Sequence, residues 1–130
     1  MEILRSIDIE NTIRQALSPF FTVYCRPLPA NFTIPSLLVQ RVGGTDSNTI
    51  DTFDVTIDAR ANSEATADEL LRNAIGVLKQ VAKEQTTPLR FVEVNSSGSW
   101  GSDPVRPELA MCSARIRVVA HQEKTTINRR

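Results

Sequence analysis

Residues 53–60 alternate apolar and polar side chains without interruption. A period of two residues is the pattern of a β-strand that has one face in the core and the other in water. The apolar positions are Phe53, Val55, Ile57 and Ala59, and the polar ones are Asp54, Thr56, Asp58 and Arg60. We therefore predict a strand over residues 49–61, in a sheet that the rest of the chain covers on one face only.

An apolar segment, SLLVQRV at residues 36–42, predicts the hairpin partner of this strand, and the small polar residues 43–48 between them are typical of a turn. A phosphate-binding loop needs a lysine and a hydroxyl after its glycines, with a helix behind them. Here no lysine follows Gly43 and Gly44, a strand comes next, and the third glycine of a dinucleotide fingerprint is missing. We interpret the glycine pair as hairpin geometry.

A helix that covers the sheet is predicted over residues 62–85, where apolar side chains recur at helical spacing and Ser63 can cap the first turn. Gly76 stands in the middle of this helix at a cost of about 1 kcal/mol relative to alanine, and we expect close approach of a neighbouring element to compensate for it. A shorter helix is predicted over residues 6–17, with Ser6 or Asp8 as its cap.

Three further strands are predicted: residues 22–28, an edge or short strand because prolines follow it, residues 88–96, and residues 108–122. The predicted fold is α+β, an antiparallel-dominated mixed β-sheet of four to five strands with two helices packed on one face. Residues 1–122 are expected to form a single domain and residues 123–130 a flexible C-terminal tail.

The composition argues against several classes of protein. Fifteen basic and fifteen acidic side chains cancel, so the chain lacks the positive field of a dedicated nucleic-acid binder or the basic cluster of a membrane-surface protein. No apolar run approaches the ~18 residues that cross a bilayer, and the first ten residues do not have the pattern of a signal peptide. We interpret Cys25 and Cys112 as buried, reduced thiols, with a disulfide between adjacent strands as the alternative.

Three aspartates in or beside the alternating strand are candidates for a metal site. Asp54 and Asp58 share a strand face but lie ~13 Å apart at the rise of a strand, too far to share one divalent ion, and Asp51 has the opposite parity. The pattern therefore indicates a solvated strand face. The basic side chains expected to partner it are Arg60, Arg115 and Arg117.

No catalytic arrangement is visible in the sequence. His121 is the one histidine, and Cys112 stands nine residues before it with the opposite strand parity, which argues against a thiol–imidazole pair. We therefore expect no enzyme, no cofactor and no metal. Trp100 stands in the serine- and glycine-rich loop 95–107, where two interpretations stay open: it folds back over the edge of the core, or it projects into a partner.

The order of segments resembles the tail terminator family of long-tailed bacteriophages, also called tail completion or minor tail proteins. The resemblance covers about residues 9–120 and is carried by the segments LPANFTIPSLLVQRVGGTDSN, the strand ending in DARA, SEATADELLRNAIGVL, and VEVNSSGSWGSDPVRPELAMCSARIRV. These are similar to the family's proline-rich lead-in, its RxGG hairpin, its strand ending in alanine and arginine, its acid-capped helix and its closing strand–loop–strand.

The resemblance implies a structural virion protein that is assembled in the host cytoplasm. A homo-oligomeric ring, usually a hexamer, would cap the head-proximal end of the tail tube, stop its polymerisation and dock to the head-tail connector or neck, while DNA passes through without specific binding. The expected partners are the chain itself, the major tail tube protein and the neck protein.

Two sets of residues are candidates for these roles. The residues expected at a subunit or tube interface are Arg41, Gly43, Gly44, Asp46, Asn48 and Trp100. Those expected to face the channel are Asp54, Asp58, Arg115 and Arg117. Two alternative functions stay open, a head-completion or stopper protein at the portal and, more distantly, a regulatory α+β domain that binds a small ligand.

Overall fold

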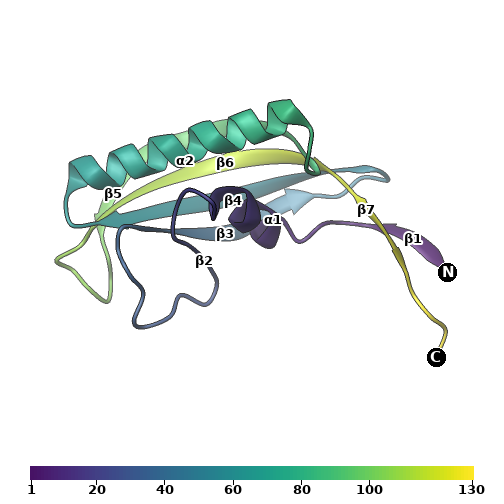
Figure 1. Ribbon diagram of the computed structural model, residues 1–130, viewed down its shortest axis with the longest axis horizontal. Helices are drawn as coiled ribbons and strands as arrows, with labels where there is room; N and C mark the ends of the chain where they lie inside the picture. The colour runs from purple at the N-terminus through teal and green to yellow at the C-terminus, as the bar shows by residue number, and fades with distance from the viewer.

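The computed structural model describes residues 1–130, apart from the side chains at positions 97 and 99. The chain forms two helices and seven strands (Figure 1). In chain order they are β1 (Glu2–Arg5), α1 (Ile9–Leu17), β2 (Val23–Cys25), β3 (Ser36–Thr45), β4 (Ile50–Ala61), α2 (Glu64–Glu84), β5 (Leu89–Ser102), β6 (Ala110–His121) and β7 (Glu123–Thr126).

The main sheet has five strands in the order β2-β3-β4-β6-β5. β2 pairs with β3 in parallel, and all other neighbours in this sheet are antiparallel. The predicted α+β class, with a mixed and mainly antiparallel sheet, is therefore confirmed. β2 is a short edge strand, as expected for a segment that Pro27 follows, because proline has no N–H to continue a ladder.

A second sheet, made of β1 and β7, was not predicted. Residues 123–130 were expected to be a flexible tail, but Glu123–Thr126 pair with Glu2–Arg5 in antiparallel register. Arg5 and Glu123, 118 positions apart in the chain, form an ion pair of 2.8 Å between the two strands. Neither segment carries a long alternating pattern, so nothing local in the sequence marks this pairing. The resulting ribbon extends beyond one end of the main sheet (Figure 1).

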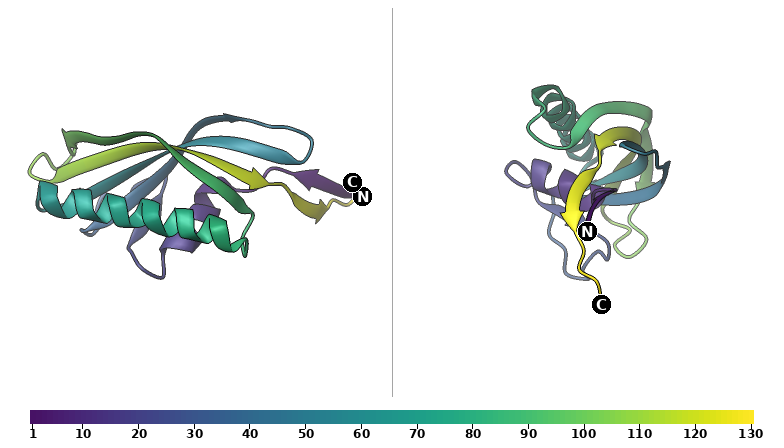
Figure 2. Two further views of the ribbon diagram at one scale, coloured as in Figure 1. Left: turned by 90° about the horizontal axis from the view of Figure 1, so that it is seen from above. Right: turned by 90° about the vertical axis from the view of Figure 1, so that its right-hand side faces the viewer.

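Both helices pack on the same face of the main sheet, as predicted (Figure 2). α2 lies against β4, β5 and β6, and α1 lies against β2, β3 and α2. Ser63 caps α2 by accepting a hydrogen bond from the Thr66 amide, and Asp8 caps α1 in the same way through Asn11. The largest fully buried side chains of this core are Phe53, Ile13, Leu17, Leu37, Ile57, Leu71, Leu78, Leu89, Ile116, Val39, Val55 and Val118.

The expectation for Gly76 is wrong. A Cβ built at this position meets no atom within 4 Å, because Gly76 lies on the exposed side of α2. No close approach of a neighbouring element therefore compensates for this glycine, and it destabilises α2 by about 1 kcal/mol relative to alanine.

Two connections are shorter than predicted, because their flanking strands are longer. β3 continues to Thr45, so Gly43 and Gly44 lie in the arm of the hairpin and not at its tip. β5 continues to Ser102, so most of the expected loop 95–107 is strand, and Trp100 pairs with Cys112 of β6. The serine- and glycine-rich end of β5 has weak strand propensity, and its main-chain pairing with β6 explains why it is extended.

Candidate functional site

The face of the main sheet opposite the helices holds the four residues that were predicted to face a channel. The Arg117 guanidinium lies 3.4 Å from the Asp54 carboxylate, directly across the β4–β6 pair. Asp58 accepts a hydrogen bond of 2.6 Å from the Ser113 hydroxyl, and the exposed Arg115 lies opposite Thr56. The strand parity expected for this open face is therefore confirmed.

Charge on the open face is nearly balanced and alternates in sign. One cross-strand row runs from Glu93 on β5 through Arg117 on β6 to Asp54 on β4. Exposed pairs of this kind contribute at most about 1 kcal/mol to stability. Their larger effect is to neutralise one another, so that the face has no strong field of one sign.

Gly44 is required by the close approach of two main chains. Its φ is +137°, and a Cβ there would lie 2.2 Å from the carbonyl oxygen of Thr52 and 2.9 Å from Cα of Phe53. At Gly43 a Cβ would only make an ordinary contact of 3.5 Å with a carboxylate oxygen of Asp54. A register shift between Arg41 and Gly43 accompanies this geometry. The glycine pair thus serves the hairpin itself.

The other residues predicted for an interface at this hairpin differ in their surroundings. Arg41 is half-buried on the helix-covered face, with its guanidinium carbon 4.8 Å from the centre of the Phe53 ring and its Nε donating to the Gly43 carbonyl. Asp46 accepts a hydrogen bond from the Ser6 hydroxyl. Asn48 is exposed at the tip of the hairpin. Of these three, Asn48 is the side chain most available to a neighbour.

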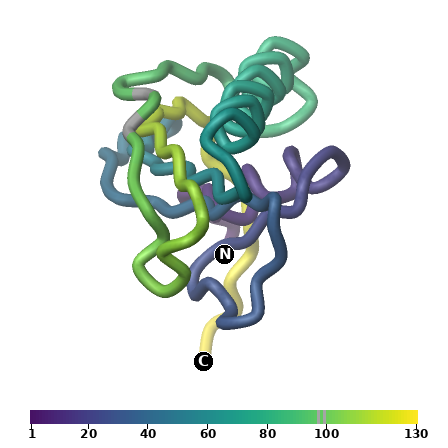
Figure 3. The backbone as a smooth tube through the Cα atoms, turned by 90° about the vertical axis from the view of Figure 1, so that its left-hand side faces the viewer, coloured from purple at the N-terminus to yellow at the C-terminus, as the bar shows by residue number. Residues whose placement is uncertain are grey.

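Arg60 is not the solvent-facing partner that was expected. Its side chain is 8% exposed, and its Nε donates to the Asp103 carboxylate at 2.5 Å. The connections 26–35 and 103–109 lie next to each other (Figure 3). They cover the end of the main sheet at which Arg60 lies. Phe32, from the first connection, packs against two guanidinium groups, with the Cζ atoms of Arg60 and Arg106 5.7 Å and 4.3 Å from the centre of its ring.

Asp103 organises this cluster, which the sequence analysis did not identify. Burial raises the pKa of its carboxyl, but hydrogen bonds from the Arg106 amide, the Arg60 side chain and the Val105 amide outweigh burial and hold the pKa below its ordinary value of 3.8. The sequence signal available was the Asp–Pro dipeptide at 103–104, a common turn former.

Both thiols are free, as predicted. Cys112 is buried, as expected, but Cys25 is only half-buried, because it lies on the edge strand β2. Burial raises the pKa of each, with a smaller contribution from Glu10 at Cys25 and from Asp68 at Cys112. Both are therefore weak nucleophiles at neutral pH. His121 and Cys112 lie nine residues apart on β6 with opposite parity, which keeps them from meeting.

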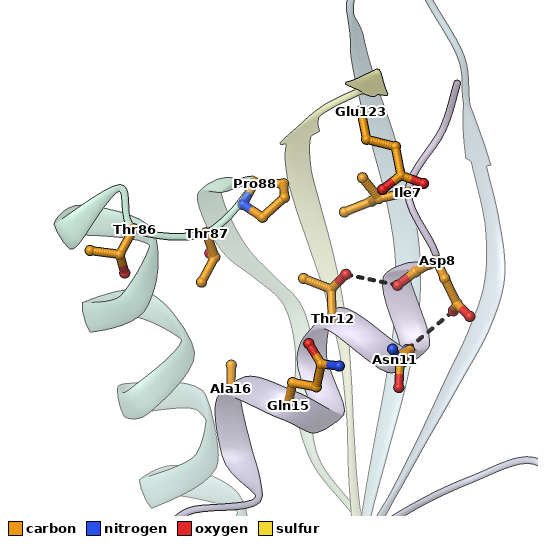
Figure 4. A pocket seen from close by; sticks show the side chains of 10 residues that line it. All are labelled: Ile7, Asp8, Asn11, Thr12, Gln15, Ala16, Thr86, Thr87, Pro88 and Glu123. Atoms are coloured by element: carbon orange, nitrogen blue, oxygen red, sulfur yellow. Dashed lines mark hydrogen bonds between the residues drawn. The ribbon is translucent and has the colours of Figure 1, made fainter. Parts of the chain in front are cut away.

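A hollow of about 570 Å³ lies between α1 and the connection that follows α2 (Figure 4). Several of its polar groups are already engaged within the chain. Asp8 caps α1 and its carbonyl accepts from the Thr12 hydroxyl, Thr87 accepts from the Leu89 amide, and Glu123 pairs with Arg5. The hollow therefore offers few uncommitted polar groups to a small molecule.

No protein-family model matches the chain, and no match was found among curated proteins. Among the described residues, no group of three or more histidine, cysteine, aspartate or glutamate side chains is arranged to hold a metal ion. No helix in the described part of the chain is long and apolar enough to span a membrane.

The Gly44→Ala substitution is predicted to lower the free energy of unfolding by about 2 kcal/mol or more, because the new Cβ collides with β4 and the positive φ strains any L side chain. Gly43→Ala is the matched control and should change it by less than about 1 kcal/mol. Urea unfolding of both variants measures the difference. Equal effects at the two positions would contradict the assignment of the close contact to Gly44.

Asp103→Asn is predicted to lower the free energy of unfolding by about 3 kcal/mol at neutral pH, since it leaves the buried Arg60 guanidinium unpaired. The pKa of folded Asp103 is lowered, so its stabilisation is complete above the unfolded pKa and is lost as pH falls through the folded pKa. The gap between wild type and variant should therefore close in acid, below about pH 4. Urea titrations over a pH series measure it.

Glu108→Gln is the control for that experiment, because Glu108 is exposed in the same connection. This variant should remain within about 0.5 kcal/mol of wild type. A gap between wild type and Asp103→Asn that stayed constant into strong acid would show that the Asp103 charge is not what stabilises the cluster.

Proposed function

We propose that this chain is a structural protein of the virion of a long-tailed bacteriophage, one that forms a ring on the head-proximal end of the tail tube. The ring would stop tube polymerisation and provide the docking surface for the neck. The sequence resemblance motivates the proposal, and the open sheet face and the shape of the chain support it.

The observation that carries the proposal is the open face of the main sheet. The face carries charges of both signs: Asp54 is paired with Arg117, and Asp58 accepts a hydrogen bond from the neutral Ser113 hydroxyl. A surface that lines a passage for DNA has to avoid a strong positive field, which would bind the phosphate backbone and retard it. A face with balanced charge meets this requirement without repelling DNA strongly.

The outline of the chain suits assembly into a ring. The β1–β7 ribbon extends from one end of the main sheet, and the end of the β5–β6 hairpin lies at the other (Figure 1). A contact that joins one end of a subunit to a different surface of the next is heterologous, and such contacts close into rings when the rotation permits. Trp100 is 47% exposed near the end of the β5–β6 hairpin, and the exposed Asn48 lies at the tip of the β3–β4 hairpin, at the opposite end of the sheet. Both supply side chains for such contacts.

The proposal is tested by polymerising the purified major tail tube protein of the parent phage in the presence of this protein. The expected result is that tubes stop growing, at a length that falls as the ratio of this protein to tube protein rises. Negative-stain images should show the added protein at one end of each tube only. Tubes that grow equally long with and without it would contradict a terminator function.

Replacing Asp54 and Asp58 together with lysine is predicted to slow DNA ejection from assembled particles, because the open face then carries an excess of positive charge. Asp54→Asn with Asp58→Asn is the matched control, which removes two negative charges without adding positive ones and should have a smaller effect. DNA release triggered from purified virions, followed by dye fluorescence, measures the rate. Unchanged kinetics in the lysine variant would place this face away from the DNA.

A further inference from the structure

β5 is a long edge strand of the main sheet, with β6 as its one neighbour. Three register shifts interrupt its pairing with β6, but residues 91–94 form a regular stretch between two of them. In an antiparallel strand, alternate residues direct their N–H and C=O groups away from the paired neighbour. The outer edge of residues 91–94 therefore presents main-chain groups with which a further strand can pair.

A groove of about 460 Å³ lies beside this edge, between β5 and the C-terminal half of α2. Ala82, Val92 and Val94 contribute apolar surface to it, and Phe91 at the same edge is 56% exposed. An edge that offers hydrogen bonds next to an apolar groove is the arrangement by which extended peptides are bound through strand addition. The main chain provides affinity there, and the groove selects the side chains.

The rim of the groove is basic. Lys79 and Lys83 on α2 and Arg90 on β5 line it, against the single acidic residue Glu93. Charge complementarity therefore favours an occupant with acidic side chains. Phosphate groups would also satisfy a basic rim, but the apolar wall and the free strand edge favour a polypeptide.

The charges of this chain argue against a second copy as the occupant. A two-fold pairing of β5 with β5 would bring two basic rims together. The C-terminal end carries Arg129 and Arg130, which have the wrong sign for the groove. The other edge strand, β2, has no acidic side chain to offer the rim, and Arg26 after it is paired with Glu10.

We propose that the outer edge of β5 at residues 91–94, together with the groove along α2, binds an extended segment of a different protein whose groove-facing residues, every second residue along the strand, include both apolar and acidic side chains. The segment adds a strand to the main sheet. On its groove-facing side, apolar side chains enter the groove and carboxylates pair with Lys79, Lys83 and Arg90 at its rim. This inference rests on the outer edge of β5 and the groove along α2, whereas the proposed ring function rests on the open face, and it stands independently of that function.

The test uses the full-length, isotope-labelled protein and a capped peptide in which every second residue is threonine and the residues between the threonines are valine and glutamate in turn. We expect saturable binding, with amide shifts in the NMR spectrum centred on residues 79–83 and 90–94. A peptide with lysine in place of glutamate is expected not to bind. Lys79→Glu combined with Lys83→Glu should weaken binding of the glutamate peptide at least about tenfold.

Lys124→Glu is the control for charge reversal, because this exposed lysine lies on the β1–β7 ribbon and does not line the groove. It should leave the affinity for the glutamate peptide unchanged. Three results would overturn the proposal: no saturable binding, shifts centred elsewhere, or equal binding of both peptides. Competition by a short DNA duplex for the same residues would also overturn it, since the rim would then recognise phosphate.

Discussion

The pairing of β4 with β6 is the interaction on which the rest of the structure depends. These two strands match over twelve positions, from Ile50 opposite His121 to Ala61 opposite Ala110, with no shift in register. Both of their outer neighbours do contain shifts, β3 beside β4 and β5 beside β6. The regular pair thus fixes which side chains face the helices, while the irregular strands on either side bend the edges of the sheet.

The two faces defined by this pair have different tasks. On the covered face, Phe53, Ile57 and Ile116 are completely buried beneath the helices, which supplies the hydrophobic free energy of folding. On the open face, Asp54 and Arg117 neutralise each other across the same two strands. A one-residue slip would exchange these faces and bury the charges, so the core and the open face specify the register together.

Local patterns in the sequence predicted what depends on local periodicity: α2, the alternating strands β4 and β6, and the faces of Asp54 and Asp58. What the sequence did not reveal depends on contacts between distant segments. The strand parity of Arg60 predicts that its side chain faces solvent. In the structure the connections that carry Phe32 and Asp103 cover it. Apolar and polar residues do not alternate over a long stretch in β1, in β7 or at the C-terminal end of β5. These segments are extended because they pair with other strands.

Disruption of this gene in its parent phage, followed by electron microscopy of the lysate, tests the proposed function most directly. If the protein terminates the tail tube, tails should be overlong and variable in length, and they should not be attached to heads. Tails of normal length beside unjoined or leaking heads would contradict termination and place the protein at the portal. Normal infectious particles would contradict a role in the virion altogether.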